Sequence, residues 1–298
     1  MKVSIIISTL NRHKVLAQNI ELLLKQSDSF EEIIIIDQSD VVPKDFLSGI
    51  NKSKKIKYFR QNTKNVATGY STGAKKAKGD IILYLDDDVI PGYNLVDFHV
   101  KNYTNEKIGG VTGRVVEPYN NNVWTNGRAN CITKYGNVIQ NVTSKDKDET
   151  PAVSGGNMSF RKSVVKKAGY FDTKYIGNAY RIETDFSIQV TKLGYKLIFE
   201  PKALAIHLNV VSGGTRKTRQ TAQTWYFNYF HNYSYFFFKN CNHLYFPVFL
   251  LQKTVLLWGL KCAILGLLIW KPRTIFGLSA PIKGIISGYR DYKLGSKL

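Results

Sequence analysis

The sequence is poor in cysteine. Its 298 residues include only Cys131, Cys241 and Cys262, which are odd in number and far apart in the chain. This spacing fits neither a disulfide framework nor a zinc site, and it is typical of a protein whose thiols stay reduced. The N-terminus also lacks the long apolar core of a signal peptide, because its first apolar run is interrupted at Asn11. We therefore expect a protein that stays in the cytoplasm.

Two phosphate-binding signatures of α/β domains are also missing. No Gly-x-Gly-x-x-Gly follows the first predicted strand, and the chain has no Walker A sequence. Both motifs surround phosphates with backbone N–H groups. Without these motifs, the sequence gives little support for a dinucleotide-dependent enzyme or an ATPase.

Acidic residues are scarce in the C-terminal third. Asp291 is the only one after Glu200, although the same stretch contains 13 Lys and Arg, and the formal net charge of the chain is +20. A long region of one charge sign is typical of proteins that bind a polyanion or the anionic face of a membrane.

The first ninety residues alternate between short apolar runs and segments with apolar residues at helical spacing. This pattern predicts strands at 3–8, 33–36, 56–60 and 81–85, and helices at 13–26 and 68–77. Strand–helix alternation with short connections implies a mainly parallel, Rossmann-like sheet with right-handed crossovers. Later segments predict a helix at 181–190 and two strands, 194–201 and 203–207. The expected fold class is α/β.

Three adjacent carboxylates follow the strand predicted at 81–85. They are Asp86, Asp87 and Asp88. In open α/β sheets, ligands bind beyond the carboxyl ends of the strands. Adjacent carboxylates repel one another unless a cation is bound, and their hard oxygen atoms favour Mg²⁺ or Mn²⁺ together with phosphates. A solvated acidic turn is the alternative.

Three later features are each consistent with a functional site or with a purely structural role. Gly155 and Gly156 allow the backbone to approach a ligand closely, or they form a turn. Glu183 and Asp185 lie in the first turn of a predicted helix, where acidic side chains also favour the helix dipole. His207 ends an apolar strand, where a single histidine is more often structural.

Taken in order, these segments resemble the catalytic domain of glycosyltransferase family 2, of the GT-A type, over residues 1–208. Residues 4–12, Ser-Ile-Ile-Ile-Ser-Thr-Leu-Asn-Arg, are similar to the opening strand and nucleotide loop of that family. Residues 33–37, Ile-Ile-Ile-Ile-Asp, are similar to its second strand. Residues 77–88 are similar to the segment that leads into the D-x-D motif, here Asp-Asp-Asp.

The later motifs follow in the same order. Residues 154–161, Ser-Gly-Gly-Asn-Met-Ser-Phe-Arg, are similar to the Gly-Gly-Asn element on the acceptor side. Residues 183–185, Glu-Thr-Asp, resemble the catalytic acidic helix, and residues 201–207 resemble the strand that bears a late metal-ligating histidine. Each motif alone is weak, but the ordered series is specific.

The resemblance implies roles for individual residues. A divalent cation, Mn²⁺ or Mg²⁺, would be held by Asp86, Asp88 and His207, and Glu183 would be the catalytic general base. Donor contacts are expected from Thr9, Asn11, Arg12, Asp37, Asn65, Asp86 and Asp87. Acceptor or diphosphate contacts are expected from Gly155, Gly156, Asn157 and Asp185.

A glycine-rich basic loop at 211–219 follows His207 directly. We expect it to close over the diphosphate, with Arg216 and Arg219 as contacts, because glycine gives mobility and arginine suits phosphate. A solvated basic loop is the alternative.

The chain departs from the family pattern at three positions. Gln38 stands where the family often has a second Asp, and Tyr70 stands where it often has Arg, so each removes an expected nucleotide contact. Ile182-Glu183 replaces the common Glu-Asp, which leaves Glu183 in the base position with a side chain one methylene longer.

Aromatic residues crowd 225–249, and residues 246–270 are long enough to cross a bilayer but contain Lys253 and Lys261. The free-energy cost of inserting the two lysines into a bilayer nearly cancels the favourable insertion free energy of the apolar residues. We therefore expect residues 209–298 to be a basic loop and helical region associated with the membrane surface, after a catalytic domain at 1–208. Stacking on nucleic acid is less favoured. A helical subdomain packed on the catalytic domain, or on a second copy of the chain, stays open.

These features together predict an inverting, metal-dependent glycosyltransferase at the cytoplasmic face of the cell membrane. It would move one sugar from a nucleotide-diphosphate sugar, such as a UDP-sugar, to a hydroxyl of a lipid-linked glycan in bacterial surface polysaccharide synthesis. The Gln-x-x-Arg-Trp motif of processive synthases is missing, which favours single additions. The alternatives are a polyprenyl-phosphate glycosyltransferase and a non-catalytic basic protein that binds membrane or RNA.

Overall fold

The structure is a computed structural model that describes residues 1–26, 30–118, 130–214, 221–253 and 279–295. The chain forms two compact units. The first unit comprises Met1–Cys131, Ile139–Thr173 and Glu183–Thr215, and the second comprises Ile132–Val138, Lys174–Ile182 and Arg216–Leu298.

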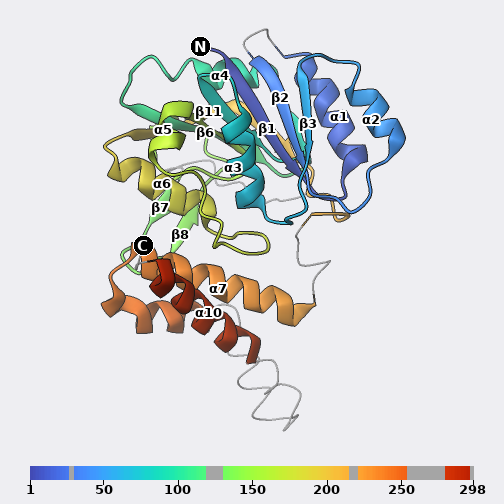
Figure 1. The fold of residues 1–298 in the computed structure, drawn as a ribbon. Helices are drawn as coiled ribbons and strands as arrows, with labels where there is room; N and C mark the ends of the chain where they lie inside the picture. Colours follow the sequence, from blue (N-terminus) through green and yellow to red (C-terminus); the bar gives the residue numbers. More distant parts are fainter. Residues whose placement is uncertain (27–29, 119–129, 215–220, 254–278, 296–298) are drawn as a thin grey trace. The chain divides into compact units, whose positions relative to one another are not determined.

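A nine-stranded sheet organises the first unit (Figure 1). Its strands are β1 (Val3–Thr9), β2 (Phe30–Asp37), β3 (Ile56–Arg60), β4 (Ile81–Leu85), β5 (Val89–Pro91), β6 (Ile108–Val116), β9 (Asp148–Glu149), β10 (Asn157–Arg161) and β11 (Lys196–His207). The order along the sheet is β3-β2-β1-β4-β10-β6-β11-β5, and β9 pairs with β11. A separate pair is formed by β7 (Asn130–Ile132) and β8 (Val138–Gln140).

The sheet is mainly parallel, as the sequence predicts. Strands β3, β2, β1 and β4 are parallel to one another, and β11 is parallel to β6. Strand β10 is antiparallel to both β4 and β6, and β5 is antiparallel to β11. The expected α/β fold class is confirmed.

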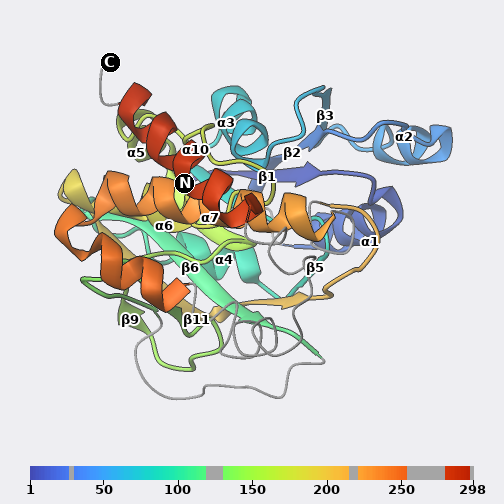
Figure 2. The ribbon, with the colours of Figure 1, turned by 90° about the horizontal axis from the view of Figure 1, so that it is seen from below.

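Helices cover both faces of this sheet. The helices of the first unit are α1 (His13–Leu24), α2 (Lys44–Ile50), α3 (Val66–Lys76), α4 (Leu95–Val100), α5 (Lys162–Lys167) and α6 (Ile182–Lys192). Helices α1, α2 and α4 supply Leu16, Phe46 and Leu95 to one core cluster, while a Cβ on Gly73 of α3 would meet Ile6 on the opposite face. Figure 2 shows α3 and α1 on opposite sides of β1 and β2.

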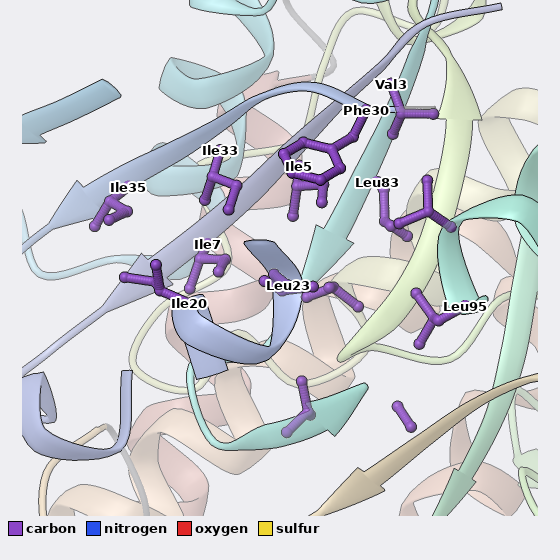
Figure 3. Packing of buried hydrophobic residues seen from close by; sticks show 14 of the residues in the cluster. Val3, Ile5, Ile7, Ile20, Leu23, Phe30, Ile33, Ile35, Leu83 and Leu95 are labelled. Atoms are coloured by element: carbon purple, nitrogen blue, oxygen red, sulfur yellow. The ribbon is translucent and has the colours of Figure 1, made fainter. Parts of the chain in front are cut away.

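The apolar strands are buried on both sides. Ile5 and Ile7 of β1 point into the cluster beneath α1, where they pack with Leu83 of β4 (Figure 3). Ile6 and Tyr84 point to the other face, and neither has exposed surface. Burial on both faces explains why these strands are continuous apolar runs without polar alternation.

One prediction about the strands is wrong. The segments 194–201 and 203–207 form a single strand, β11, whose pairing with β6 shifts register between Glu200 and Leu204. Pro201 lies inside the shift. Because proline has no N–H to donate to the ladder, the chain bulges there and then resumes pairing.

The second unit is built on two helices that run side by side (Figure 1). They are α7 (Ala222–Asn240) and α10 (Ser279–Gly295). Small residues of α10 allow the close approach, since a Cβ added to Gly284 would lie 2.5 Å from the carbonyl oxygen of Phe227. A 3-10 turn, η2 (His243–Tyr245), and helical residues 246–253 follow α7 in the chain.

Aromatic rings form the core of the second unit. Tyr229, Phe230, Tyr233 and Phe237 of α7 cluster with Phe249. Among the helices that the structure describes, none combines the length and apolar character needed to cross a bilayer. The expectation for 246–270 concerns mostly residues beyond 253, which lie outside the described part of the chain.

Candidate active site

The candidate site lies at the carboxyl ends of the parallel strands. Thr9 pairs with Asp37 at the ends of β1 and β2, and Ile7 pairs with Leu85, the last residue of β4. Asp86 follows Leu85 directly. The register of the sheet therefore brings three predicted site segments to one edge, as expected for a ligand site in an α/β sheet.

The three adjacent aspartates have different environments. Asp87 accepts hydrogen bonds from Thr9 Oγ1 at 2.7 Å and from Arg12 Nη1 at 2.8 Å. Burial raises the pKa of Asp87 to about 6, although Arg12 acts to lower it. Among the residues predicted to contact the donor, Thr9 and Arg12 thus both bind Asp87, and these bonds hold the loop after β1 against the end of β4.

Arg12 also joins this loop to the segment after β11. Its Nε donates to the carbonyl of Ser212 at 2.9 Å and its Nη2 to that of Val210 at 2.8 Å. Gly213 packs so closely that a Cβ would lie 2.6 Å from the carbonyl oxygen of Asn11. The first part of the predicted closing loop is therefore held in place, whereas Arg216 and Arg219 lie outside the described residues.

Asp86, Asp88 and His207 form a group that could hold a metal ion. One ligand atom from each lies within 4.8 Å of the other two. His207 Nε2 is 3.2 Å from Asp88 Oδ1 and 3.8 Å from Asp86 Oδ2. The Asp86 side chain is 39% exposed and the Asp88 side chain 1%, so the group opens to solvent on one side. Two carboxylates, an imidazole and room for further oxygen ligands fit Mn²⁺ or Mg²⁺.

Glu117, just past the end of β6, orients the histidine of this group. Its Oε1 is 3.4 Å from His207 Nδ1. A hydrogen bond donated by Nδ1–H leaves the lone pair of Nε2 facing the two aspartates, which is the tautomer that a metal ligand needs. The sequence carried no signal for Glu117, because it lies 90 positions from His207 and follows no motif.

Removing Glu117 is expected to weaken cation binding. Glu117→Ala should lower the affinity for Mn²⁺ by about 10–100-fold, the usual effect of losing the partner of a ligating histidine. Mn²⁺ titration followed by electron paramagnetic resonance measures it. Glu117→Gln keeps an acceptor for Nδ1 and should recover most of the affinity, while Glu106→Ala on the exposed surface should have no effect. Unchanged affinity in Glu117→Ala would show that His207 needs no such support.

Glu183 lies close to this group across two glycines. A Cβ added to Gly155 would lie 2.5 Å from Glu183 Oε1, and one added to Gly156 would lie 2.7 Å from Asp86 Oδ2. Gly156 also has a φ of +82°, which favours glycine. Two consecutive residues thus touch the two carboxylates. Neither position accommodates a side chain without displacing one of them.

Helix α6 fixes the position of Glu183. Ser187 Oγ donates to the carbonyl of Glu183 at 2.7 Å and accepts from the N–H of Val153 at 3.0 Å. This bond joins the first turn of α6 to the segment that leads into Gly155. Asp185, in the same turn of α6, is 2% exposed, and its expected acceptor contact stays a prediction.

Tyr70 on α3 is a site residue that sequence reasoning missed. Its hydroxyl donates to Asp86 Oδ1 at 3.3 Å, and its ring packs against Tyr84 and Phe171. Burial, followed by the charges of Asp86 and Glu183, raises the pKa of Tyr70, so it stays a donor. Its position is one of the departures from the family pattern, and that departure was the available signal.

The other predicted donor residues form the edge of the site. Asp37 has no exposed surface and accepts from Tyr58 Oη at 2.7 Å, the N–H of Ser39 at 2.8 Å and His13 Nε2 at 2.8 Å. Burial acts to raise the pKa of Asp37, but these hydrogen bonds outweigh it and hold the pKa below its ordinary value.

Asn11 and Asn65 shape the neighbouring loops. Asn11 has a φ of +57°, and its N–H donates to Ser39 Oγ at 2.6 Å. Asn65 caps α3 by accepting from the N–H of Thr68 at 3.2 Å. Both residues therefore fix backbone at the edge of the site.

Asn157 differs from its expected role. It is fully buried, and its Nδ2 donates to the carbonyls of Ala203 at 2.8 Å and Arg114 at 3.2 Å. Its Oδ1 is 2.8 Å from Nε2 of His99, whose Nδ1 is 2.8 Å from Ser159 Oγ. The side chain thus ties β10, β6, β11 and α4 together next to the two glycines, and it has no exposed surface.

The buried His99 makes a testable contribution to acid stability. Burial lowers the pKa of His99 to about 4, below the value of about 6.5 for an unfolded histidine. As pH falls from 6.5 to 4, the unfolded chain takes up a proton that the folded chain does not, which removes at most about 3 kcal/mol of folding free energy. His99→Gln should lose that part of the pH dependence in urea unfolding, whereas His243→Gln on the surface should keep it. Identical slopes in His99→Gln and the native chain would contradict the assignment.

Two solved structures share the fold. A crystal structure of GalNAc-T7 with UDP, GalNAc and Mn2+ aligns with a TM-score of 0.61 at 17% identity, covering 80% of this chain and 50% of that one. A structure of the mannosyltransferase PcManGT from Pyrobaculum calidifontis in complex with GDP-Man and Mn2+ gives 0.59 at 14% identity, covering 97% and 87%. The fold of this chain is therefore the GT-A fold.

The family follows from the sequence match. Residues 4–169 match the family described as Glycosyl transferase family 2, and the chain belongs to that family. An uncharacterized glycosyltransferase of Rickettsia bellii (strain RML369-C) is 34% identical over 101 residues, and one of Rickettsia felis (strain ATCC VR-1525 / URRWXCal2) is 36% identical over 88 residues. These matches cover 34% and 29% of this chain and span 15% of the length of each relative.

Proposed function

We propose that this chain is an inverting, divalent-cation-dependent glycosyltransferase that transfers one sugar from a nucleotide-diphosphate sugar to a hydroxyl group. One observation carries the proposal. Asp86 of the Asp86–Asp88–His207 group lies against Gly156, and the Glu183 carboxylate lies against the preceding Gly155. A cation-binding group with a further carboxylate close to it supplies the two functions that transfer from a diphosphate needs.

Each residue has a distinct task in this reaction. Asp86, Asp88 and His207 would hold a Mn²⁺ or Mg²⁺ ion, which when bound neutralises the charge that develops on the diphosphate leaving group. Glu183 would take the proton of the acceptor hydroxyl as that oxygen attacks the anomeric carbon from the opposite side, which inverts the configuration. Tyr70 would keep Asp86 in position through its hydrogen bond.

The known structures support a nucleotide-sugar donor. GalNAc-T7 was solved with UDP and Mn2+, and PcManGT with GDP-Man and Mn2+. We propose a UDP-sugar as the donor of this chain, with GDP-sugars as the next candidates.

A lipid-linked glycan at the cytoplasmic face of the membrane is the proposed acceptor. Support comes from α10, on which Ile282, Ile286 and Tyr289 recur at helical spacing and are 53%, 61% and 41% exposed. Exposed Lys283 and Arg290 flank this apolar stripe, and such a combination suits an anionic lipid surface. Failure of the full chain to co-sediment with anionic vesicles would count against the membrane part of the proposal.

A donor screen tests the proposed function. The full chain is incubated with UDP-, GDP-, dTDP- and CMP-sugars with and without Mn²⁺, and nucleotide release is measured. One nucleotide sugar should be hydrolysed only with the cation, and its nucleotide should raise the melting temperature only in the presence of Mn²⁺. No release and no stabilisation with any donor would instead favour a non-catalytic binding protein.

A further inference from the structure

Two cations meet on one aromatic ring in the second unit. Arg181 donates from Nε and Nη2 to the Tyr233 hydroxyl at 3.0 and 2.5 Å, and its Cζ lies 5.2 Å from the ring centroid of Tyr180. Lys253 places its Nζ 4.3 Å from the ring centroid of Tyr233 and 5.7 Å from that of Phe249. We refer to Arg181, Lys253, Tyr180, Tyr233 and Phe249 as the cation–aromatic cluster.

Arg181 and Lys253 have no acidic partner within the part of the chain that the structure describes. The single acidic residue of the C-terminal third, Asp291, lies beside His231 and Arg290. Lys253 is only 8% exposed. Burial, with the nearby charge of Arg181, lowers the pKa of Lys253 to about 8.

Such an arrangement is unfavourable unless an anion joins it. A buried ammonium group without a counter-charge loses hydration, and a second cation beside it adds repulsion. Aromatic rings compensate for part of this cost. Within the described residues, only Nε and Nη2 of the Arg181 guanidinium donate hydrogen bonds, so Nη1 can donate to a ligand.

We infer that Arg181 and Lys253 form a binding site for a phosphate or diphosphate group. Two adjacent positive charges match a group that carries about two negative charges near neutral pH, and the guanidinium presents the geometry that phosphate oxygens accept. Tyr180, 40% exposed, offers an apolar wall to whatever the phosphate carries. The inference goes beyond the proposed function, because it requires neither Glu183 nor the Asp86–Asp88–His207 group.

Binding of inorganic pyrophosphate to the full chain tests the inference. Isothermal titration calorimetry is run in EDTA, which prevents cation-dependent binding at Asp86, Asp88 and His207. Lys253→Met should lower the affinity at least tenfold, and Lys253→Arg should restore most of it. Lys134→Met is the matched control, because Lys134 also lies over tyrosine rings in the second unit, and it should bind like the native chain.

A second arm identifies the source of the phosphate. Co-sedimentation compares vesicles of phosphatidylcholine containing phosphatidic acid with vesicles of equal charge containing phosphatidylglycerol. A preference for phosphatidic acid that disappears in Lys253→Met assigns the site to a lipid phosphate monoester. Pyrophosphate binding without that preference assigns it to a soluble phosphate compound.

Thermal unfolding separates the proposed site from a purely structural cluster. If Arg181 and Lys253 form an anion-binding site, the melting temperature of Lys253→Met without ligand should equal or exceed that of the native chain. Pyrophosphate should no longer raise the melting temperature of this variant. If Lys253 only supports packing, Lys253→Met should melt lower and bind both probes as the native chain does, which would overturn the inference. The inference would also be overturned if the native chain bound neither pyrophosphate nor the phosphatidic acid vesicles.

Discussion

Glu183→Gln is expected to lower turnover by about 10²–10⁴-fold, the usual contribution of a positioned general base. Glutamine keeps the size of the side chain and its place against Gly155, but it does not take up the proton of the acceptor hydroxyl. Binding of donor nucleotide with Mn²⁺ should change little, because the cation-binding group stays intact. Steady-state kinetics with the donor found in the screen gives the first quantity, and nucleotide-dependent thermal stabilisation gives the second.

A matched substitution separates this effect from a loss of fold. Glu106→Gln makes the same chemical change at an exposed position and should leave turnover unchanged. Near-native turnover in Glu183→Gln would remove Glu183 from the base position. Equal losses of turnover and of nucleotide binding would instead indicate that the residue holds the local structure.

Asp86→Asn is expected to lower turnover by at least about 100-fold, because a bound cation contributes several kcal/mol to transition-state stabilisation and each 1.4 kcal/mol is a factor of ten. Asparagine keeps the shape of the side chain but lacks the negative charge. The concentration of Mn²⁺ that gives half-maximal activity should rise, and excess Mn²⁺ should recover part of the turnover.

Asp86 suits this test because its side chain is 39% exposed. Asp88 is almost fully buried and pairs with Arg12 at 3.1 Å, so replacing it would also disturb the fold. Asp45→Asn, on the exposed first turn of α2, is the control and should behave as the native chain. An Asp86→Asn variant with native turnover and native dependence on Mn²⁺ would contradict the proposed cation site.

Local sequence determined the layers of the first unit. Apolar runs such as Ile81–Leu85 are buried on both faces and mark parallel interior strands, and the strand at Ile56–Arg60 has the bounds that the sequence predicts. The pattern did not reveal that 196–207 is one strand. Whether a proline ends a strand or only shifts its register depends on the partner, and β6 continues past Pro201.

The acidic triplet shows why residue chemistry alone did not assign individual roles in the site, which only the resemblance to the D-x-D motif gave to Asp86 and Asp88. Asp86, Asp87 and Asp88 are equivalent in sequence, yet Asp87 turns to Thr9 and Arg12 while its neighbours face His207. The direction of each side chain depends on what the other strand ends bring to it.

The sequence by itself determined that the chain is an α/β protein with carboxylates at the end of a buried strand, because burial on both faces and the chemistry of adjacent aspartates are local properties. Only the tertiary structure decided which groups meet there. Glu117 reaches His207, Tyr70 reaches Asp86, and Arg181 and Lys253 share the ring of Tyr233. Each of these contacts joins residues far apart in the chain, and strand register and helix packing, rather than spacing in the sequence, bring them within bonding distance.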